Sequence, residues 1–251
     1  MGSLSQTLRS ARGVVFDFYG TLAGDRVSVP PMWRELQAMG YPSHPALEAM
    51  YEPDAFDGSA TPRLGGGPEH DAWLRGNWRG FARHSGVPAV DLERVVDHLL
   101  EVRDRYEACA LPGAARLIAG LRERGLGVGL CSNWESLIEP YLQQAGLGGF
   151  DAVVTSCVLG VRKPHPAIFA EVCTALGLAP GEVLFVGDNW TADVTGALRA
   201  GMSAVWLRNG RPPVGVDVVP EADTIGDLAD AVEEALPLPA VAGSGSGRSR
   251  A

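Results

Sequence analysis

A short apolar run near the start of the chain, set apart from a later series of similar runs, constrains the fold most. This first run, Gly13 to Phe18, reads Gly-Val-Val-Phe-Asp-Phe. After Pro112, comparable runs recur between amphipathic helices, at 127–131, 151–155, 183–187 and 203–207. Near-continuous apolar strands that alternate with helices are typical of a parallel sheet covered on both faces. The pattern therefore predicts an α/β fold, a Rossmann-like doubly wound parallel sheet.

The segment 25–108 has a different pattern. It has almost no β-rich run, and it contains amphipathic stretches from Trp73 to His84 and from Leu92 to Tyr106. We therefore expect an α-helical cap inserted into the sheet domain, over the ends of its strands. The expected organisation is a core of residues 11–24 and 109–235, the cap at 25–108, and a disordered Gly/Ser-rich tail at 236–251. The residues before Ala11 are expected to form a loose leader.

Composition and charge exclude several classes of protein. The 251 residues are 46% hydrophobic and 20% charged, and the net charge is −9, which argues against a nucleic-acid binder or an anionic-membrane binder. The uncharged stretches fall short of the roughly 20 residues of a membrane helix, and the first ten residues lack the apolar run of a signal peptide. A cytoplasmic location follows as an expectation. The four cysteines form no CxxC pair, so reduced thiols are expected rather than zinc ligands.

Polar residues follow four of the expected strands. In chain order these residues are Asp17, then Ser132 and Asn133, then Lys163, then Asp188 and Asp193. Ligands of parallel α/β sheets bind beyond the carboxyl ends of the strands. Each residue alone has a second interpretation as a helix cap or a loop residue. However, capping does not account for Lys163 before Pro164, nor for a second acid so soon after Asp188.

Four segments contain these residues. They read Asp17-Phe-Tyr-Gly-Thr-Leu22, Cys131-Ser-Asn133, Gly160-Val-Arg-Lys-Pro164 and Val186-Gly-Asp-Asn-Trp-Thr-Ala-Asp193. In this order they resemble the four motifs of the haloacid dehalogenase-like hydrolase superfamily. The insert between the first two motifs is similar to the helical cap of the branch that includes 2-haloacid dehalogenases and phosphoglycolate phosphatase-like enzymes.

The resemblance implies a hydrolase in which Asp17 is the nucleophile. A carboxylate nucleophile divides a difficult displacement into two easier steps, through a covalent ester that water then hydrolyses. Thr21 and Ser132 would supply hydroxyls to the transferring group, and Asn133 belongs to the same set of catalytic candidates. Lys163 would keep Asp17 ionised and offset negative charge on the substrate.

The same resemblance implies a magnesium site. Asp188 and Asp193, together with Asp17, offer the hard oxygen donors that suit Mg²⁺. In the family, the metal also takes the backbone carbonyl of the residue two after the nucleophile, here Tyr19. Judged from the residues alone, Asp193 has an alternative role as an acid that interacts with the dipole of the following helix.

Tyr19 stands where phosphatases of this superfamily usually have a second aspartate that acts as general acid and then base. A tyrosine there is similar to the 2-haloacid dehalogenases, which displace halide from carbon without a metal. The spacing of Asp188 and Asp193 instead matches the phosphatases. Two extra carboxylates would also repel the carboxylate substrate of a dehalogenase.

Two further positions weaken the dehalogenase interpretation. Those enzymes have a cap arginine for the halide, in a region that here contains Leu47, Glu48 and Ala49, and a tyrosine where this chain has Phe169. We therefore expect a Mg²⁺-dependent phosphatase that acts on a small phosphate ester through an aspartyl phosphate. A 2-haloacid dehalogenase, other phosphoryl or phosphonyl chemistry, and a non-catalytic binding protein are the alternatives.

Overall fold

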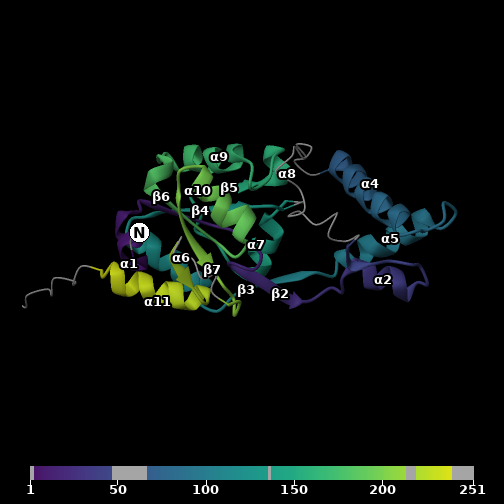
Figure 1. Ribbon diagram of the computed structural model, residues 1–251, viewed down its shortest axis with the longest axis horizontal. Helices are drawn as coiled ribbons and strands as arrows, with labels where there is room; N and C mark the ends of the chain where they lie inside the picture. Colours follow the sequence, from purple (N-terminus) through teal and green to yellow (C-terminus); the bar gives the residue numbers. More distant parts are fainter. Residues whose placement is uncertain (1–2, 47–66, 135–136, 213–218, 239–251) are drawn as a thin grey trace, which may run out of the picture.

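The computed structural model describes residues 3–46, 67–134, 137–212 and 219–238. At its centre is a sheet of six parallel strands (Figure 1). In spatial order the strands are β5 (Ala152–Thr155), β4 (Gly127–Ser132), β1 (Gly13–Phe16), β6 (Val183–Gly187), β7 (Ser203–Leu207) and β8 (Glu221–Ala222). The chain begins in the middle of the sheet and builds outward in both directions. The predicted doubly wound parallel sheet is thus confirmed.

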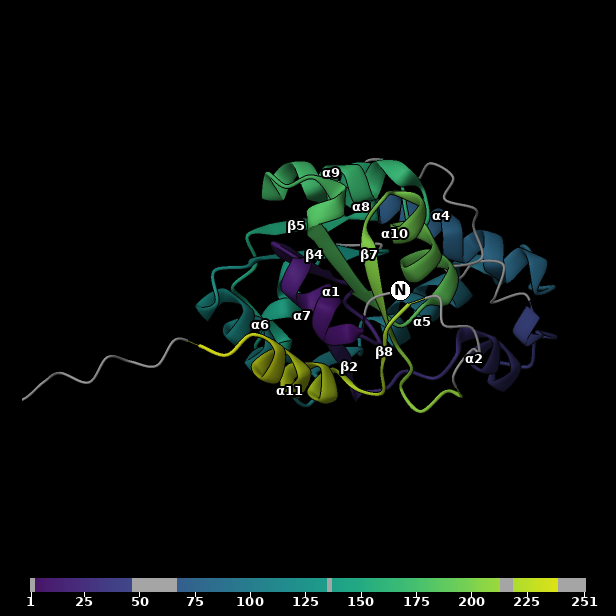
Figure 2. The same cartoon turned by 60° about the vertical axis from the view of Figure 1, so that its left-hand side comes forward.

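Helices cover both faces of this sheet (Figure 2). Side chains alternate along β1, so Val14 and Phe16 face one layer and Val15 faces the other. The first layer contains α1 (Leu4–Ser10), α6 (Ala114–Glu123), α7 (Glu139–Ala145) and α11 (Ile225–Ala235). The second contains α9 (Pro166–Leu176), the helical turn η3 (Trp190–Thr195) and α10 (Gly196–Arg199). The short elements α8 (Ser156–Leu159) and η2 (Pro180–Glu182) complete the core.

The expectation of a loose leader before Ala11 is wrong. Residues Leu4–Ser10 form α1, in which Leu8 is only 1% exposed and packs into the first layer. The Arg9 side chain also donates to the carbonyl of Ala235 at the end of α11, at 3.1 Å. A seven-residue helix with one fully buried leucine has too short an apolar pattern to stand out in the sequence.

The cap is joined to the core by two antiparallel strands, β2 (Ala23–Val27) and β3 (Glu107–Ala110). The expected cap boundaries, residues 25 and 108, fall inside these strands. The described cap helices are α2 (Met32–Ala38), α4 (Pro68–His84) and α5 (Leu92–Arg103). The first amphipathic stretch lies within α4, and the second is helical as far as Arg103. Leu36, Phe81 and Leu99, one from each helix, are fully buried in a separate apolar cluster. The cap therefore has a hydrophobic core of its own.

The structure agrees only in part with several other predictions about helices and the tail. The apolar spacing of Leu137, Ile138, Tyr141 and Leu142 predicts a helix at 135–145, and the structure has it from Glu139, with residues 135–136 outside the described part. The sequence also predicts one helix at 191–200, between two of the apolar runs, and the structure divides this segment into η3 and α10. Of the expected tail, residues 239–251 lie outside the described residues.

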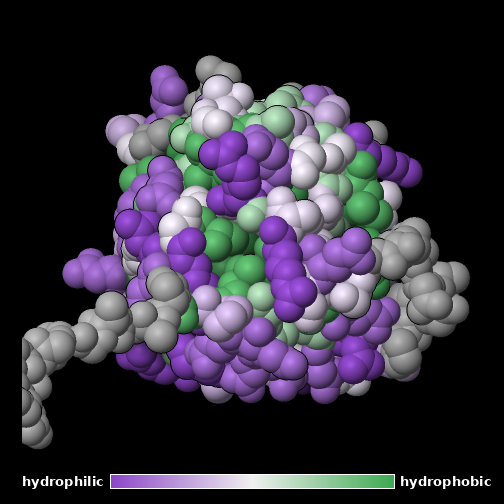
Figure 3. Space-filling model, turned by 90° about the vertical axis from the view of Figure 1, so that its left-hand side faces the viewer, coloured by the Kyte–Doolittle hydropathy of each residue, from purple (hydrophilic) through white to green (hydrophobic). Residues whose placement is uncertain are grey.

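The remaining features of the fold concern the cysteines, the apolar content of the helices and one face of the surface. All four cysteines are free thiols, and three of them are buried, whereas Cys109 is partly exposed. No helix in the described ranges has the length and apolar content needed to cross a bilayer. Figure 3 views the end of the molecule opposite the cap, where hydrophilic residues surround a smaller group of hydrophobic ones.

Candidate active site

Asp17 and Asp188 meet because they follow neighbouring strands of the parallel sheet. Asp17 comes directly after β1, and its backbone N–H donates to the carbonyl of Val186 in β6 at 3.0 Å. The strand pairing thus continues one residue past β1 and brings Asp17 next to the end of β6, where Asp188 follows. Ser132 ends β4 on the other side of β1. Asp17, Ser132 and Asp188 therefore lie at one edge of the sheet, where their strands end.

Lys163 links two of the acids. Its ammonium group, 2% exposed, donates to Asp17 Oδ1 at 2.7 Å and to Asp193 Oδ1 at 2.5 Å. The Lys163 backbone is held by the side chain of Asn133, whose Oδ1 accepts from Lys163 N at 2.8 Å and whose Nδ2 donates to Lys163 O at 3.0 Å. Asn133 therefore positions the lysine, and this role could not be predicted from the sequence.

Asp17 is anchored through one of its two carboxylate oxygens. Ser132 Oγ donates to Asp17 Oδ1 at 3.0 Å, so this oxygen accepts from both Ser132 and Lys163. The side-chain hydrogen bonds of Asp17 within the described part of the chain all go to Oδ1. This leaves Oδ2 as the oxygen that can attack a substrate or bind a cation.

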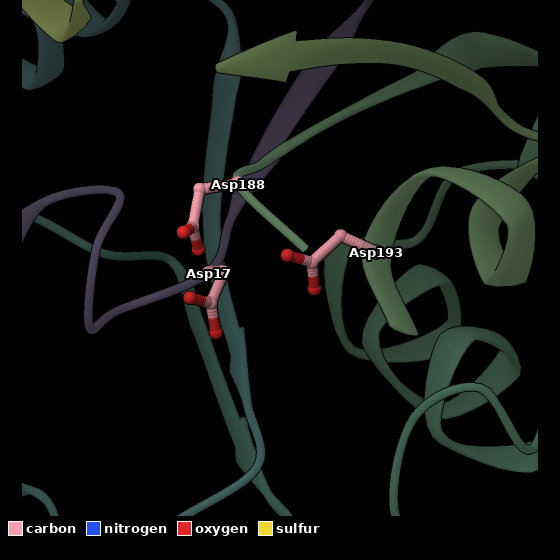
Figure 4. Close-up of side chains that lie close together, drawn as sticks. All are labelled: Asp17, Asp188 and Asp193. Atoms are coloured by element: carbon pink, nitrogen blue, oxygen red, sulfur yellow. The ribbon is translucent and has the colours of Figure 1, made fainter. Parts of the chain in front are cut away.

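Asp17, Asp188 and Asp193 form the acidic cluster of the site (Figure 4). One carboxylate oxygen from each lies within 4.8 Å of the others. Two glycines allow this close approach. A Cβ on Gly187 would overlap the Asp193 carboxylate, and a Cβ on Gly20, which has φ +80°, would press on the Asp188 carboxylate.

Burial and mutual repulsion shape the electrostatics of this cluster. Burial raises the pKa of Asp193 above its ordinary value, and the charge of Asp17 adds to the rise, while Lys163 opposes it. The pKa of Asp188 is also raised, by burial and by Asp17, with Arg211 opposing. Burial alone would lower the pKa of Lys163, but Asp17 and Asp193 outweigh it and the pKa is raised, so the ammonium is retained. The site holds more negative charge than the lysine neutralises.

Arg211 was missed from the sequence. Its Nη2 donates to Asp188 Oδ2 at 2.8 Å, and its Nη1 donates to the Asp188 carbonyl at 2.5 Å. The signal was available, because residues 208–212 follow the strand at 203–207 and therefore lie at the same edge of the sheet. The residues predicted from strand ends did not include those after this strand.

The structure does not bring the remaining candidates into the hydrogen-bonded group around Asp17. Thr21 is fully buried, and its hydroxyl has no hydrogen-bond partner among the described residues. Tyr19 is 47% exposed, and its ring lies 6.2 Å from that of Tyr106, beside the strands that lead to the cap. Phe169 packs against Phe185 in the core. The region of Leu47, Glu48 and Ala49 lies outside the described residues.

The chain is similar to known phosphatases and to a dehalogenase. The chain is 32% identical to a phosphoserine phosphatase of Thermus thermophilus, over 80% of this chain and 77% of that protein. It is 29% identical to a phosphoglycolate phosphatase of Salmonella typhimurium, over 92% of this chain and 95% of that protein. Among solved structures, an L-2-haloacid dehalogenase matches with a TM-score of 0.57 and 26% identity, over 89% of this chain and 99% of that one.

The family model of the haloacid dehalogenase-like hydrolases matches residues 11–201. This range includes all four motifs and the insert between the first two, so the match is not limited to the common α/β core. The chain belongs to the haloacid dehalogenase-like hydrolases.

Proposed function

We propose that this protein is a Mg²⁺-dependent phosphatase that hydrolyses a small phosphorylated metabolite through an aspartyl phosphate on Asp17. The observation that carries the proposal is the acidic cluster with Lys163 beside it. A nucleophile alone would need neither Asp188 nor Asp193, and three carboxylates so close together repel one another. Their retention beside Asp17 is explained if the site binds a cation together with an anionic group.

The residues fit Mg²⁺. Asp17, Asp188 and Asp193 would hold it, since they supply hard, negatively charged oxygen donors within a small space. The backbone carbonyl of Tyr19 is a further ligand that we propose from the family resemblance. When bound, the metal would neutralise charge on a phosphoryl oxygen and help to orient the phosphate.

The chain's own residues account for the chemical steps. Asp17 Oδ2 attacks the phosphorus atom, the bond from phosphorus to the ester oxygen breaks, and the leaving oxygen takes a proton from the Tyr19 phenol or from water, so that the alcohol departs. Water then attacks the phosphorus atom of the aspartyl phosphate, which releases inorganic phosphate, restores the Asp17 carboxylate and returns a proton to the donor of the first step. Throughout, Lys163 and Ser132 hold Asp17 through Oδ1 and keep Oδ2 directed at the phosphate.

The similar proteins support the phosphatase over other hydrolases. The two relatives described above are named for phosphoserine and phosphoglycolate, which are small phosphorylated molecules. We infer a substrate of the same class for this chain.

A 2-haloacid dehalogenase is the second candidate, and Tyr19 is the observation that favours it. The structural match to an L-2-haloacid dehalogenase is in keeping with that residue. Against it stands the charge of the site, because a carboxylate substrate would have to approach Asp188 and Asp193 as well as Asp17. At about 4 Å and an effective dielectric constant of about 20, each such pair costs several kcal/mol.

A panel of phosphorylated metabolites and 2-haloacids, assayed with Mg²⁺ and with EDTA, tests the proposal. We expect phosphate release from at least one phosphate ester, loss of that activity in EDTA, and recovery when Mg²⁺ is added. Full activity on a 2-haloacid in metal-free buffer, with halide release, would establish the second candidate instead.

Tyr19 gives a kinetic prediction. A phenol keeps its proton at neutral pH, so it can donate to a leaving oxygen but is a poor base for activating water. Breakdown of the aspartyl phosphate should therefore be slow, and Tyr19→Asp should speed it by up to about 10²–10⁴-fold. Rapid-quench measurement of labelled enzyme gives this rate directly.

Tyr19→Phe is the matched control, because it removes the hydroxyl and keeps the ring beside Tyr106. It should not accelerate breakdown. If Tyr19→Asp loses its label no faster than the wild-type enzyme, this account of Tyr19 is wrong.

A further inference from the structure

The loop that follows β7 is hydrogen-bonded to two other loops of the site, the one after Asp17 and the one that contains Asp188. Asn209 Nδ2 donates to the carbonyl of Gly20, in the loop after Asp17, at 2.6 Å. Arg211 donates to both the side chain and the carbonyl of Asp188, in the loop after β6. One short segment is thus bonded to both neighbouring strand ends.

This segment is itself fixed by its neighbours. Asn209 has φ 49°, and among the described residues it is the one non-glycine residue with a positive φ. Its N–H donates to the carbonyl of Asp223 at 2.9 Å, and the N–H of Gly210 donates to Asp223 Oδ1 at 3.3 Å. Residues kept in uncommon backbone conformations often lie at functional sites, where the surrounding structure supports them.

Arg211 controls which oxygen of Asp188 is available. Its hydrogen bond occupies Oδ2, and Asp188 is further fixed at its carbonyl by both Arg211 and the indole N–H of Trp206, the latter at 3.0 Å. The aspartate is therefore held at its backbone and at one carboxylate oxygen. Oδ1 is the oxygen left for a ligand, in the space that Gly20 leaves open.

We propose that Arg211 is a positioning residue that orients Asp188 for binding a divalent cation. The inference rests on the proposed function, in that it takes the acidic cluster to be a metal site. Partners that hold a metal ligand in place are worth about 10–100-fold in metal affinity. A carboxylate freed from Arg211 would have to be ordered again each time the cation binds.

Arg211 also has an effect that opposes cation binding, because its positive charge repels a cation. The Arg211 side chain is 51% exposed, whereas that of Asp188 is 16% exposed. Water and salt therefore screen the charge of the guanidinium group, but they do not replace the two hydrogen bonds that fix the partly buried aspartate. We expect orientation to outweigh repulsion.

The test is titration calorimetry of the full-length protein with Mg²⁺ or Mn²⁺, without substrate. Arg211→Ala should weaken cation binding by about tenfold or more. Arg211→Lys keeps one donor and the charge, so its affinity should lie between those of Arg211→Ala and the wild type. Arg199→Ala, at the exposed end of α10, removes the same charge away from Asp188 and should bind as the wild type does.

Activity gives a second readout. In Arg211→Ala the Mg²⁺ concentration for half-maximal rate should rise, while kcat at saturating Mg²⁺ stays within a few-fold of the wild-type value. A general loss of structure would not produce this split. Unchanged or tighter cation binding in Arg211→Ala would overturn the inference and leave the proposed function standing. A wild-type protein that binds neither cation would overturn both.

Discussion

Replacing Asp17 with Asn should lower turnover by several powers of ten and leave the fold intact. The amide is nearly the same size as the carboxylate and can still accept from Ser132, but it cannot form the covalent ester. Loss of a nucleophile typically has an effect of this size. Steady-state assays on the best substrate of the panel, together with circular dichroism, measure both parts of the prediction.

Asp25→Asn makes the same chemical change at an exposed position of β2 and should leave turnover near the wild-type level. A folded Asp17→Asn protein that keeps more than about a tenth of the wild-type rate would show that another group performs the attack.

Lys163→Met should strongly destabilise the metal-free protein. The ammonium lies between two buried carboxylates, and removing one partner of a buried ion pair costs about 3–5 kcal/mol because the remaining charge is left uncompensated. Urea unfolding in EDTA at neutral pH measures this loss. A variant within about 1 kcal/mol of the wild type would mean that the lysine does not hold the acids together.

The loss of stability in Lys163→Met should be larger at neutral pH than in acid. Burial already raises the pKa of Asp193, and removing Lys163 raises it further. The folded variant then binds a proton more tightly than the unfolded chain, so its stability falls as pH rises through the raised pKa of Asp193. The difference from the wild type should therefore be smallest in acid. Lys163→Met/Asp193→Asn is the control, because it removes one of the two uncompensated charges and should recover part of the lost stability at neutral pH.

The core elements that could be predicted closely have clear local signals at their ends. Strand β6 has the bounds expected from its apolar run, 183–187, and α9 begins at Pro166 and is followed by Gly177, two residue types that are typical of helix ends. Gly177 takes a left-handed conformation, φ 66°, that ends the helix. Local chemistry alone defines such elements, so one sequence is sufficient to find them.

Other elements depend on contacts that are distant in sequence. Helix α1 is stabilised by packing on α11, and α11 itself was not predicted, although Thr224 and Asp227 form a capping box at its start. The strands β2 and β3 pair only because the cap returns the chain to its starting point. No local pattern in either strand indicates its partner.

The candidate site divides in the same way. Asp17, Ser132, Asp188 and Asp193 could be placed together because strand ends of a parallel sheet share one edge. The support given by Asn133 and Arg211 depends on loop conformation, which residue spacing does not determine. The direction of the Tyr19 side chain, away toward Tyr106, is a property of the same kind.

The most direct test of the central claim is mass spectrometry of the Asp17 peptide, quenched during turnover of a phosphate ester. We expect phosphate on Asp17 in the presence of Mg²⁺ and none in EDTA or in Asp17→Asn. An unmodified Asp17 during steady phosphate release, or a carbon ester on Asp17 formed from a 2-haloacid without metal, would contradict the account.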